Sequence, residues 1–177
     1  MSEYRRDYET TDFITVCKDG DLERAQQLLQ EGFEQACMNN HFVLAKWLLQ
    51  IKPDIDISED IFIDVCRNGH LEGAQWLLQV KPDIDISHDE FSAFHCACYY
   101  GHLELAKWLL QVKADIDISH EEYMAFRWTC QSGHFEVAKW LLQVKPDIDI
   151  TAHDHDAFRN ININRYDDDA IRNGKLN

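Results

Sequence analysis

Apolar residues recur along most of the chain at the spacing of an amphipathic helix. In the segment 101–112, GHLELAKWLLQV, the residues Leu103, Ala106 and Leu110 stand at i, i+3 and i+7. This spacing predicts a helix with one wide apolar face, because residues three, four and seven apart lie on the same side of a helix. A second apolar row consists of Leu105, Leu109 and Val112, and the polar stripe consists of Glu104, Lys107 and Gln111.

A second, antiparallel helix is predicted before each such segment. In 119–131, SHEEYMAFRWTCQ, the residues Tyr123, Phe126 and Cys130 have the same helical spacing. The turn between the two helices carries a residue suited to the left-handed conformation, which closes a helix at little steric cost. This residue is Gly69, Gly101 or Gly133, and Asn40 replaces it in an earlier unit.

The sequence also marks where these helices begin and end. Ser119 with Glu122, and Ser87 with Glu90, have the spacing of a capping box, so helices are predicted to begin just after the two serines. A Lys-Pro pair follows the second helix in three units and disfavours its continuation, because proline lacks an N–H and restricts the residue before it. These pairs are 52–53, 81–82 and 145–146.

The helical units recur at a fixed distance. Cys66, Cys98 and Cys130 are each 32 residues apart, and the tryptophans on the second helices keep the same step. Self-similarity at this period indicates stacked supersecondary units, each too small to bury its apolar face alone. The tryptophans in question are Trp76, Trp108 and Trp140.

We therefore predict an all-α chain of five helix pairs and a partial sixth, with no substantial β-sheet. The repeat domain spans 12–163, between a polar N-terminal segment at 1–11 and a polar C-terminal tail at 164–177. The predicted pairs are 12–31, 33–51, 59–80, 88–112 and 120–144, with the partial pair at 155–163.

One unit, SAFHCACYYGHLELAKWLL from Ser92 to Leu110, resembles the ankyrin repeat, whose pattern is TPLHxAAxxGHLEVVKLLL. His95 stands at the TPLH histidine, and Gly101 begins the GH turn. The resemblance covers residues 12 to 160 and implies an ankyrin-repeat solenoid of stacked antiparallel helix pairs. The KWLL…KPDIDI units are similar to the ankyrin arrays of giant DNA viruses of amoebae.

The chain also departs from the family's pattern. The DxxGxTP hairpin turn is absent, and the capping-box serine stands where that β-turn would form. We therefore expect reduced or absent β-hairpins, longer first helices, and extended connectors of the sequence DIDI. Any binding through projecting hairpins then becomes doubtful, and the first helices become the better candidates for contact.

The composition and net charge limit which cellular compartment and which class of partner we expect. The chain is 45% hydrophobic with five Trp, but no apolar run is long enough to span a bilayer and its start is unlike a signal peptide. We expect an intracellular, cytoplasmic protein without a membrane partner, in the host cytoplasm if it is viral. The net charge of −15 opposes nucleic acid, because binding to phosphates depends on Lys and Arg. That charge serves either solubility or the attraction of a basic partner.

Four Cys-x3-His pairs have the residue types that zinc prefers. They are Cys37/His41, Cys66/His70, Cys98/His102 and Cys130/His134. A pattern present in every unit is typical of what each unit needs to fold, whereas an active site is normally a single constellation. We expect these thiols, and Cys17 at the same repeated position, to be reduced and to fill small interior sites. We expect no metal, no cofactor and no enzymatic activity.

The repeated carboxylates and tryptophans each have two interpretations. The DIDI connectors could offer oxygen ligands to calcium, but they lack the spacing and glycine of an EF-hand loop. Their alternation instead suggests that Ile packs while Asp faces water. Stacking platforms for bases or sugars are the alternative for the tryptophans, and packing in the core or between repeats is favoured. The tryptophans are Trp47, Trp76, Trp108 and Trp140.

Positions that differ among the copies are candidates for recognition, since positions kept constant serve the fold. Three sets differ: Arg67, Tyr99 and Gln131; Asn68, Tyr100 and Ser132; and Ile63, His95 and Arg127. The resemblance implies that this surface lines the concave face. The predicted partner-binding residues are Arg67, His95, Tyr99, Tyr100, Arg127 and Gln131.

The function predicted from these observations is a non-catalytic scaffold or adaptor that binds a protein partner on the helix face. The partner would be a basic protein or a host protein, and we expect the chain to be a monomer. One alternative is a substrate-receptor subunit of a ubiquitin ligase, although nothing after Asn160 resembles an F-box. The other alternative is a Cys/His metal-binding protein.

Overall fold

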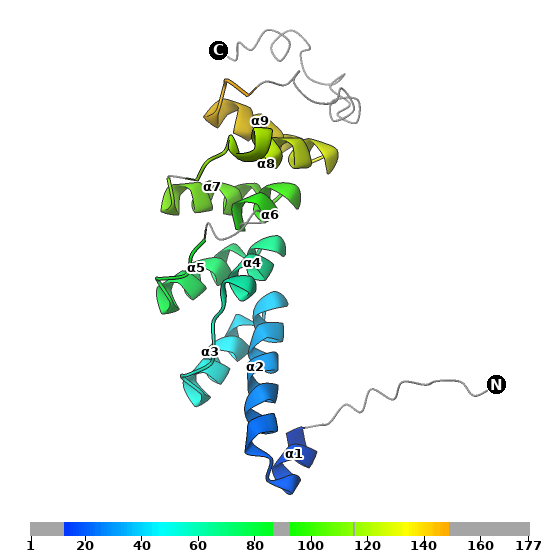
Figure 1. Ribbon diagram of the computed structural model, residues 1–177, viewed down its shortest axis with the longest axis vertical. Coiled ribbons are helices and arrows are strands. Elements are labelled where there is room, and N and C mark those ends of the chain that lie inside the picture. Colours follow the sequence, from blue (N-terminus) through cyan, green and yellow to red (C-terminus); the bar gives the residue numbers. More distant parts are fainter. Residues whose placement is uncertain (1–12, 87–92, 115, 149–177) are drawn as a thin grey trace, which may run out of the picture. The chain divides into compact units, whose positions relative to one another are not determined.

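A computed structural model describes residues 13–86, 93–114 and 116–148 (Figure 1). Within these residues the chain forms nine helices and no strand, which confirms the predicted all-α fold without β-hairpins. The chain divides into two compact units, Met1–Asp56 and Ile57–Asn177. The predicted partial pair at 155–163 and the terminal segments 1–11 and 164–177 lie outside the described residues.

The first unit contains α1 (Phe13–Asp19), α2 (Leu22–Met38) and α3 (Phe42–Ile51). Asp21 caps α2, because its Oδ1 accepts a hydrogen bond of 2.9 Å from the backbone N–H of Arg24. Helix α2 packs against both of the others and buries Phe33, Ala36 and Cys37.

The structure differs from the predicted pairs 12–31 and 33–51, because α2 runs without a break through residue 32. A single glycine inside a helix costs only about 1 kcal/mol relative to alanine, and strong helix formers surround Gly32. Gln30 Nε2 donates to Glu34 Oε1 across this point at 2.9 Å. The buried side chains that follow Gly32 hold the continuation in place.

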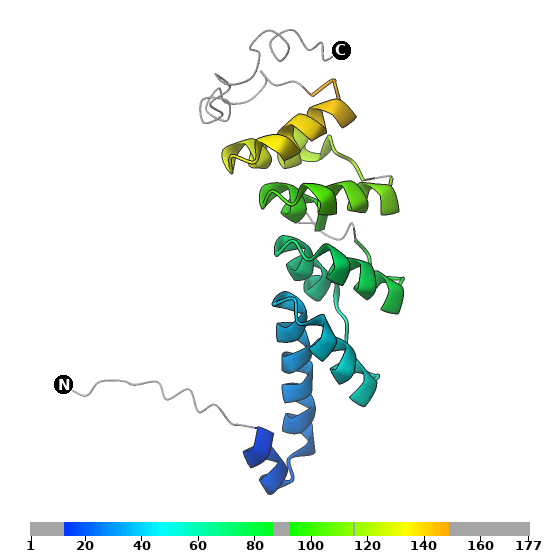
Figure 2. The same cartoon turned by 180° about the vertical axis from the view of Figure 1, so that it is seen from behind.

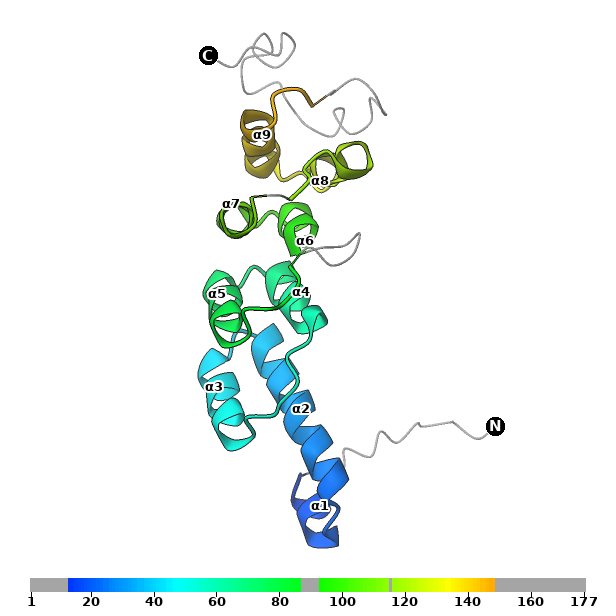
Figure 3. The ribbon, with the colours of Figure 1, turned by 60° about the vertical axis from the view of Figure 1, so that its left-hand side comes forward.

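The second unit contains three helix pairs: α4 (Glu59–Arg67) with α5 (Leu71–Val80), α6 (Ala93–Tyr99) with α7 (Leu103–Val112), and α8 (His120–Gln131) with α9 (Phe135–Val144). The first helices α4, α6 and α8 contact one another in sequence and form one layer. The second helices α5, α7 and α9 form the other layer (Figures 2 and 3). The core lies between the layers and between successive pairs.

The predicted left-handed turns are confirmed. Gly69, Gly101 and Gly133 have φ of 77°, 81° and 77°, and Asn40 has φ of 62°. The turns also bring successive pairs into close contact. A Cβ atom added to Gly69 would lie 2.5–2.9 Å from ring atoms of His102, so the histidine of the next pair packs directly on this glycine.

The DIDI connectors divide as predicted between core and water. Every described aspartate of these connectors is exposed, whereas most of the described isoleucines are buried. The buried ones are Ile55, Ile57, Ile84, Ile86, Ile118 and Ile148. Lys81 Nζ also donates to the carbonyl of Ile57 at 2.8 Å, which ties the end of α5 to the connector before α4. The second helices end before the Lys-Pro pairs, as predicted.

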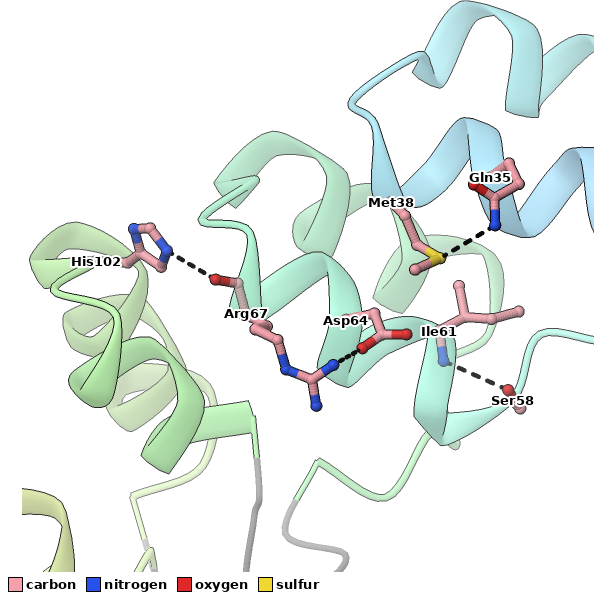
Figure 4. A network of polar contacts seen from close by, with 7 residues as sticks. All are labelled: Gln35, Met38, Ser58, Ile61, Asp64, Arg67 and His102. Atoms are coloured by element: carbon pink, nitrogen blue, oxygen red, sulfur yellow. Dashed lines mark hydrogen bonds and ion pairs between the residues drawn. The ribbon is translucent and has the colours of Figure 1, made fainter. Parts of the chain in front are cut away.

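The predicted capping box at Ser119 is not formed. The N–H and Oγ–H of Ser119 both donate to Asp117 Oδ1, at 2.9 and 2.5 Å, so the serine side chain does not cap α8. Tyr123 has φ of 65°, which shows that the first turn of α8 is not regular. Ser58 does cap its helix, because its Oγ accepts from the N–H of Ile61 at 3.4 Å (Figure 4). Ser87 lies outside the described residues.

The face assigned to α7 gives a first prediction. Leu109 is fully buried, whereas Lys107 lies at the surface and pairs with Glu104, and Val112 is exposed rather than buried as predicted. Leu109→Ala should lower the free energy of unfolding by about 2–5 kcal/mol, because it removes packed methyl groups and leaves a cavity. Lys107→Ala, the control, should change it little. Equal urea midpoints for the two variants would contradict the assigned face.

The close packing at the turns gives a second prediction. Gly101→Ala should destabilise more than Gly133→Ala, because a Cβ at Gly101 meets the ring of His134, whereas one at Gly133 meets no described atom within 4 Å. Both variants carry the strain of a left-handed alanine, about 1–2 kcal/mol. The clash should add about 1 kcal/mol or more at Gly101. Thermal unfolding of both variants tests this, and similar losses would show that His134 moves aside freely.

Candidate functional site

The ends of the first helices in the second unit surround an open groove of about 580 Å³. Its walls come from three successive repeats. Arg67, Tyr99 and Gln131 are the last residues of α4, α6 and α8, so they hold equivalent positions in the repeat. The lining residues are Arg67, Cys96, Tyr99, Tyr100, Trp128 and Gln131.

Three aromatic side chains dominate the groove. The ring of Tyr99 lies 4.8 Å from that of Tyr100 and 6.0 Å from that of Trp128, with interplanar angles of 80° and 81°. Such edge-to-face contacts fix the rings relative to one another. Tyr99 and Tyr100 remain 39% and 45% exposed, so the groove offers a rigid aromatic surface to solvent.

Arg67 provides a cation at the groove. Its guanidinium donates to Asp64 Oδ1 one helical turn earlier, and its side chain is 43% exposed (Figure 4). The carbonyl of Arg67 lies 2.9 Å from His102 Nε2, and since a carbonyl can only accept, the Nε2 donates. The end of α4 is thereby attached to the next repeat.

Cys96 forms part of the groove wall but is itself only 5% exposed. Burial raises the pKa of the Cys96 thiol, and the nearby Arg67 guanidinium partly opposes this effect. The pKa is also raised by burial in the other interior thiols, to about 12 for Cys37 and Cys130. These thiols are therefore protonated at physiological pH, and a protonated thiol is a poor nucleophile.

The Cys-x3-His pairs take part in the packing of the described residues. Each buried thiol fills an interior site, as predicted for Cys37, Cys66, Cys98 and Cys130. The histidine of the pair packs on a turn glycine of the preceding repeat in two cases, and His102 also bonds its backbone. In the described part of the chain, no three His, Cys, Asp or Glu side chains are grouped so as to hold a metal ion.

Two sequence predictions about individual side chains differ from the structure. Cys17, which shares the repeated cysteine position, is exposed, and no described repeat precedes its helix α1. Trp47 is 54% exposed instead of packed. Trp140 behaves as predicted, since its ring lies 6.4 Å from that of Phe94 in the preceding repeat.

The structure brings together four of the six predicted partner-binding residues. Arg67, Tyr99, Tyr100 and Gln131 all line the groove. His95 is only 5% exposed, and its ring lies beside that of Trp128 at 6.4 Å, so it supports the groove from the interior. The partly buried Arg127 is not among the lining residues.

Sequence reasoning missed Cys96 and Trp128. Cys96 stands three residues before Tyr99, and Trp128 stands three residues before Gln131, which is about one helical turn in each case. Asp64 is the equivalent residue in the first of these three copies. The position therefore changes from Asp to Cys to Trp among the three copies. Comparison of the copies at this position would have identified both residues, because side chains three apart on a helix share one face.

A family model described as "Ankyrin repeats (3 copies)" matches residues 13–120 and 62–154. The chain belongs to the ankyrin-repeat family. Ankyrin repeats are generally protein–protein interaction modules and are typically not catalytic. No curated protein matches the chain. Among the described residues, no helix combines the length and apolarity needed to cross a membrane.

The raised thiol pKa values give a third prediction. A buried thiol that stays neutral in the folded state ionises in the unfolded state above its ordinary pKa of 9.0, so folding stability falls as the pH rises from about 9 to about 12. Between pH 8 and pH 10, Cys130 should contribute a loss of stability of roughly 1 kcal/mol.

Urea denaturation at both pH values checks this contribution. Cys130→Ala should reduce the loss of stability on going to pH 10, whereas Cys17→Ala, which removes an exposed thiol, should retain all of it. If the two variants show the same dependence on pH, the Cys130 thiol is not buried in the folded protein.

Proposed function

We propose that this protein is a non-catalytic adaptor that holds a protein partner at the groove between the ends of α4, α6 and α8. The observation that carries the proposal is the convergence of the residues that vary between repeats. Arg67, Tyr99 and Gln131 occupy one repeat position with three different side chains, and all three line a single groove. Residues kept alike in every copy maintain the fold, so the varied residues are available for recognition.

The chemistry of the groove suits a binding hot spot. Tyrosine, tryptophan and arginine are enriched among the residues that dominate protein interfaces. Tyr99 and Tyr100 have few rotatable bonds and are fixed by their ring contacts, so little conformational entropy is lost when a partner orders them. A stable interface buries about 800 Å² on each partner. The groove would therefore be the centre of a larger contact along the first helices.

The charge of the chain favours a basic partner. A net charge of −15 raises the rate of encounter with a positively charged protein, and salt weakens this effect. We propose a host protein in that role, on the resemblance of the KWLL…KPDIDI units to ankyrin arrays of giant DNA viruses of amoebae. The adaptor would then act by placing a host protein next to another component.

The test begins with capture of the partner in the native cell. A photo-crosslinking residue, p-benzoylphenylalanine, is placed at Gln131 in the groove and, as a control, at Phe135, which is 43% exposed on α9. Only the partner crosslinked from the groove position is then purified. Its affinity for the chain is measured by calorimetry.

Tyr99→Ala and Tyr100→Ala should each weaken binding of that partner about 30-fold, equivalent to about 2 kcal/mol, because both rings lie at the centre of the proposed interface. Phe135→Ala should leave the affinity unchanged, because this equally exposed aromatic residue lies outside the groove. Melting temperatures control for folding. Unchanged affinity of both tyrosine variants would disprove the groove as the binding site.

A further inference from the structure

We propose that the groove accepts an arginine side chain from an extended, basic segment of the partner. This inference rests on the proposed function and specifies which chemical group the groove recognises. Three features of the protein support it: the aromatic faces, the Asp64 carboxylate, and the chain's own Arg67, which already occupies part of this surface.

The aromatic rings form suitable walls for a cation. The Tyr99 ring stands almost perpendicular to the rings of Tyr100 and Trp128, so the edge of one ring meets the face of another. Tyr99 and Tyr100 both remain partly exposed to solvent. The face of an aromatic ring carries negative electrostatic potential and attracts cations within about 6 Å of its centre. A guanidinium is planar and weakly hydrated, so it stacks on such faces more readily than an ammonium does.

Asp64 does not line the groove, but it supplies a carboxylate next to it through its ion pair with the lining residue Arg67. It belongs to the repeat position that continues as Cys96 and Trp128 in the groove wall, and it is paired with Arg67. Arg67 therefore shows that a guanidinium at the groove wall can reach the Asp64 carboxylate. The Arg67 side chain is 43% exposed and the Asp64 side chain 25%, so solvent still screens the pair and lowers the cost of exchanging its partners.

We infer that Arg67 competes with the incoming arginine. In the free protein Arg67 neutralises Asp64, and when the partner binds, the partner's guanidinium takes over the carboxylate while Arg67 moves toward solvent. Gln131 is exposed at the far side of the groove, and its amide oxygen can accept a further N–H bond. The net charge of −15 favours this cationic occupant over an anionic one.

The direction in which Arg67→Gln changes the affinity distinguishes a cationic occupant of the groove from an anionic one. If the groove binds arginine, Arg67→Gln removes a competing like charge and tightens binding. If the groove binds a carboxylate or phosphate group, Arg67 is the main attraction and the same substitution weakens binding. Asp64→Asn should have the opposite effect in each case.

The probe is a fluorescent hexapeptide, Gly-Arg-Gly-Gly-Arg-Gly. The control is the same peptide with both arginines replaced by citrulline, because citrulline has nearly the same shape as arginine but no charge. Binding to the full chain is followed by fluorescence anisotropy at low and high salt. We expect the citrulline peptide to bind about tenfold more weakly or worse. We expect Arg67→Gln to tighten binding of the arginine peptide about threefold at low salt, with a smaller gain at high salt.

Two substitutions of Tyr99 separate the ring's electrostatics from simple apolar contact. Tyr99→Phe retains an aromatic face and should keep most of the affinity, whereas Tyr99→Leu keeps apolar bulk without that face and should weaken binding about fivefold. Phe135→Ala, outside the groove, should have no effect.

Three results would overturn the inference: equal binding of the arginine and citrulline peptides, weaker binding by Arg67→Gln, or binding of a Gly-Glu-Gly-Gly-Glu-Gly peptide in preference to the arginine peptide. Failure of this inference can be distinguished from failure of the proposed function. If the crosslinked partner depends on Tyr99 but the arginine peptide does not bind, the groove is a protein-binding site with a different specificity. If neither ligand depends on Tyr99, both proposals are wrong.

Discussion

The packing of a histidine ring on the turn glycine of the preceding repeat sets the geometry on which the groove depends. His102 occupies the space next to Gly69 that any other side chain at residue 69 would fill, and its Nε2 donates to the carbonyl of Arg67. This contact fixes the distance and register between the end of α4 and the next helix pair. Arg67 and Tyr99 therefore reach the same groove because the residues beside them are locked together.

Elsewhere in each repeat, the same few kinds of buried side chain support this stacking. Protonated thiols fill the interior close to the turns, and isoleucines of the connectors pack inward while the aspartates between them face water. A solenoid gains most of its stability from contacts between neighbouring repeats. Identical packing positions in every copy therefore leave the remaining positions at the ends of the first helices free to change without loss of the fold.

Those remaining positions combine opposite electrostatic features in a small area. Tyr99, Tyr100 and Trp128 present rings whose faces favour cations, and the Asp64 carboxylate adds a full negative charge, while Arg67 balances it in the free protein. Solvent reaches both side chains of this ion pair, 43% of Arg67 and 25% of Asp64, and screening weakens what the pair adds to the stability of the fold. The Asp64–Arg67 pair is thus better suited to exchange than to structural support, which is the property that a recognition site requires.

The sequence by itself determined the helices, the turns and the division of the connectors, because each follows from local chemistry. The left-handed glycines, the helix ends before Lys-Pro and the alternation of Ile and Asp could all be predicted from neighbouring residues. The repeat pattern also located four of the six groove residues, since varied positions stand out against constant ones.

Tertiary structure decided the rest, because those features depend on contacts between residues far apart in the chain. Helix α2 continues through Gly32 because the side chains beyond it are buried, and the Ser119 hydroxyl bonds Asp117 instead of capping α8. The exposure of Trp47 and the burial of His95 depend on which neighbours pack over them. Cys96 and Trp128 stand at a repeat position that varies among the copies, which the sequence shows, but only the stacking of α6 against α8 brings the two side chains into one groove.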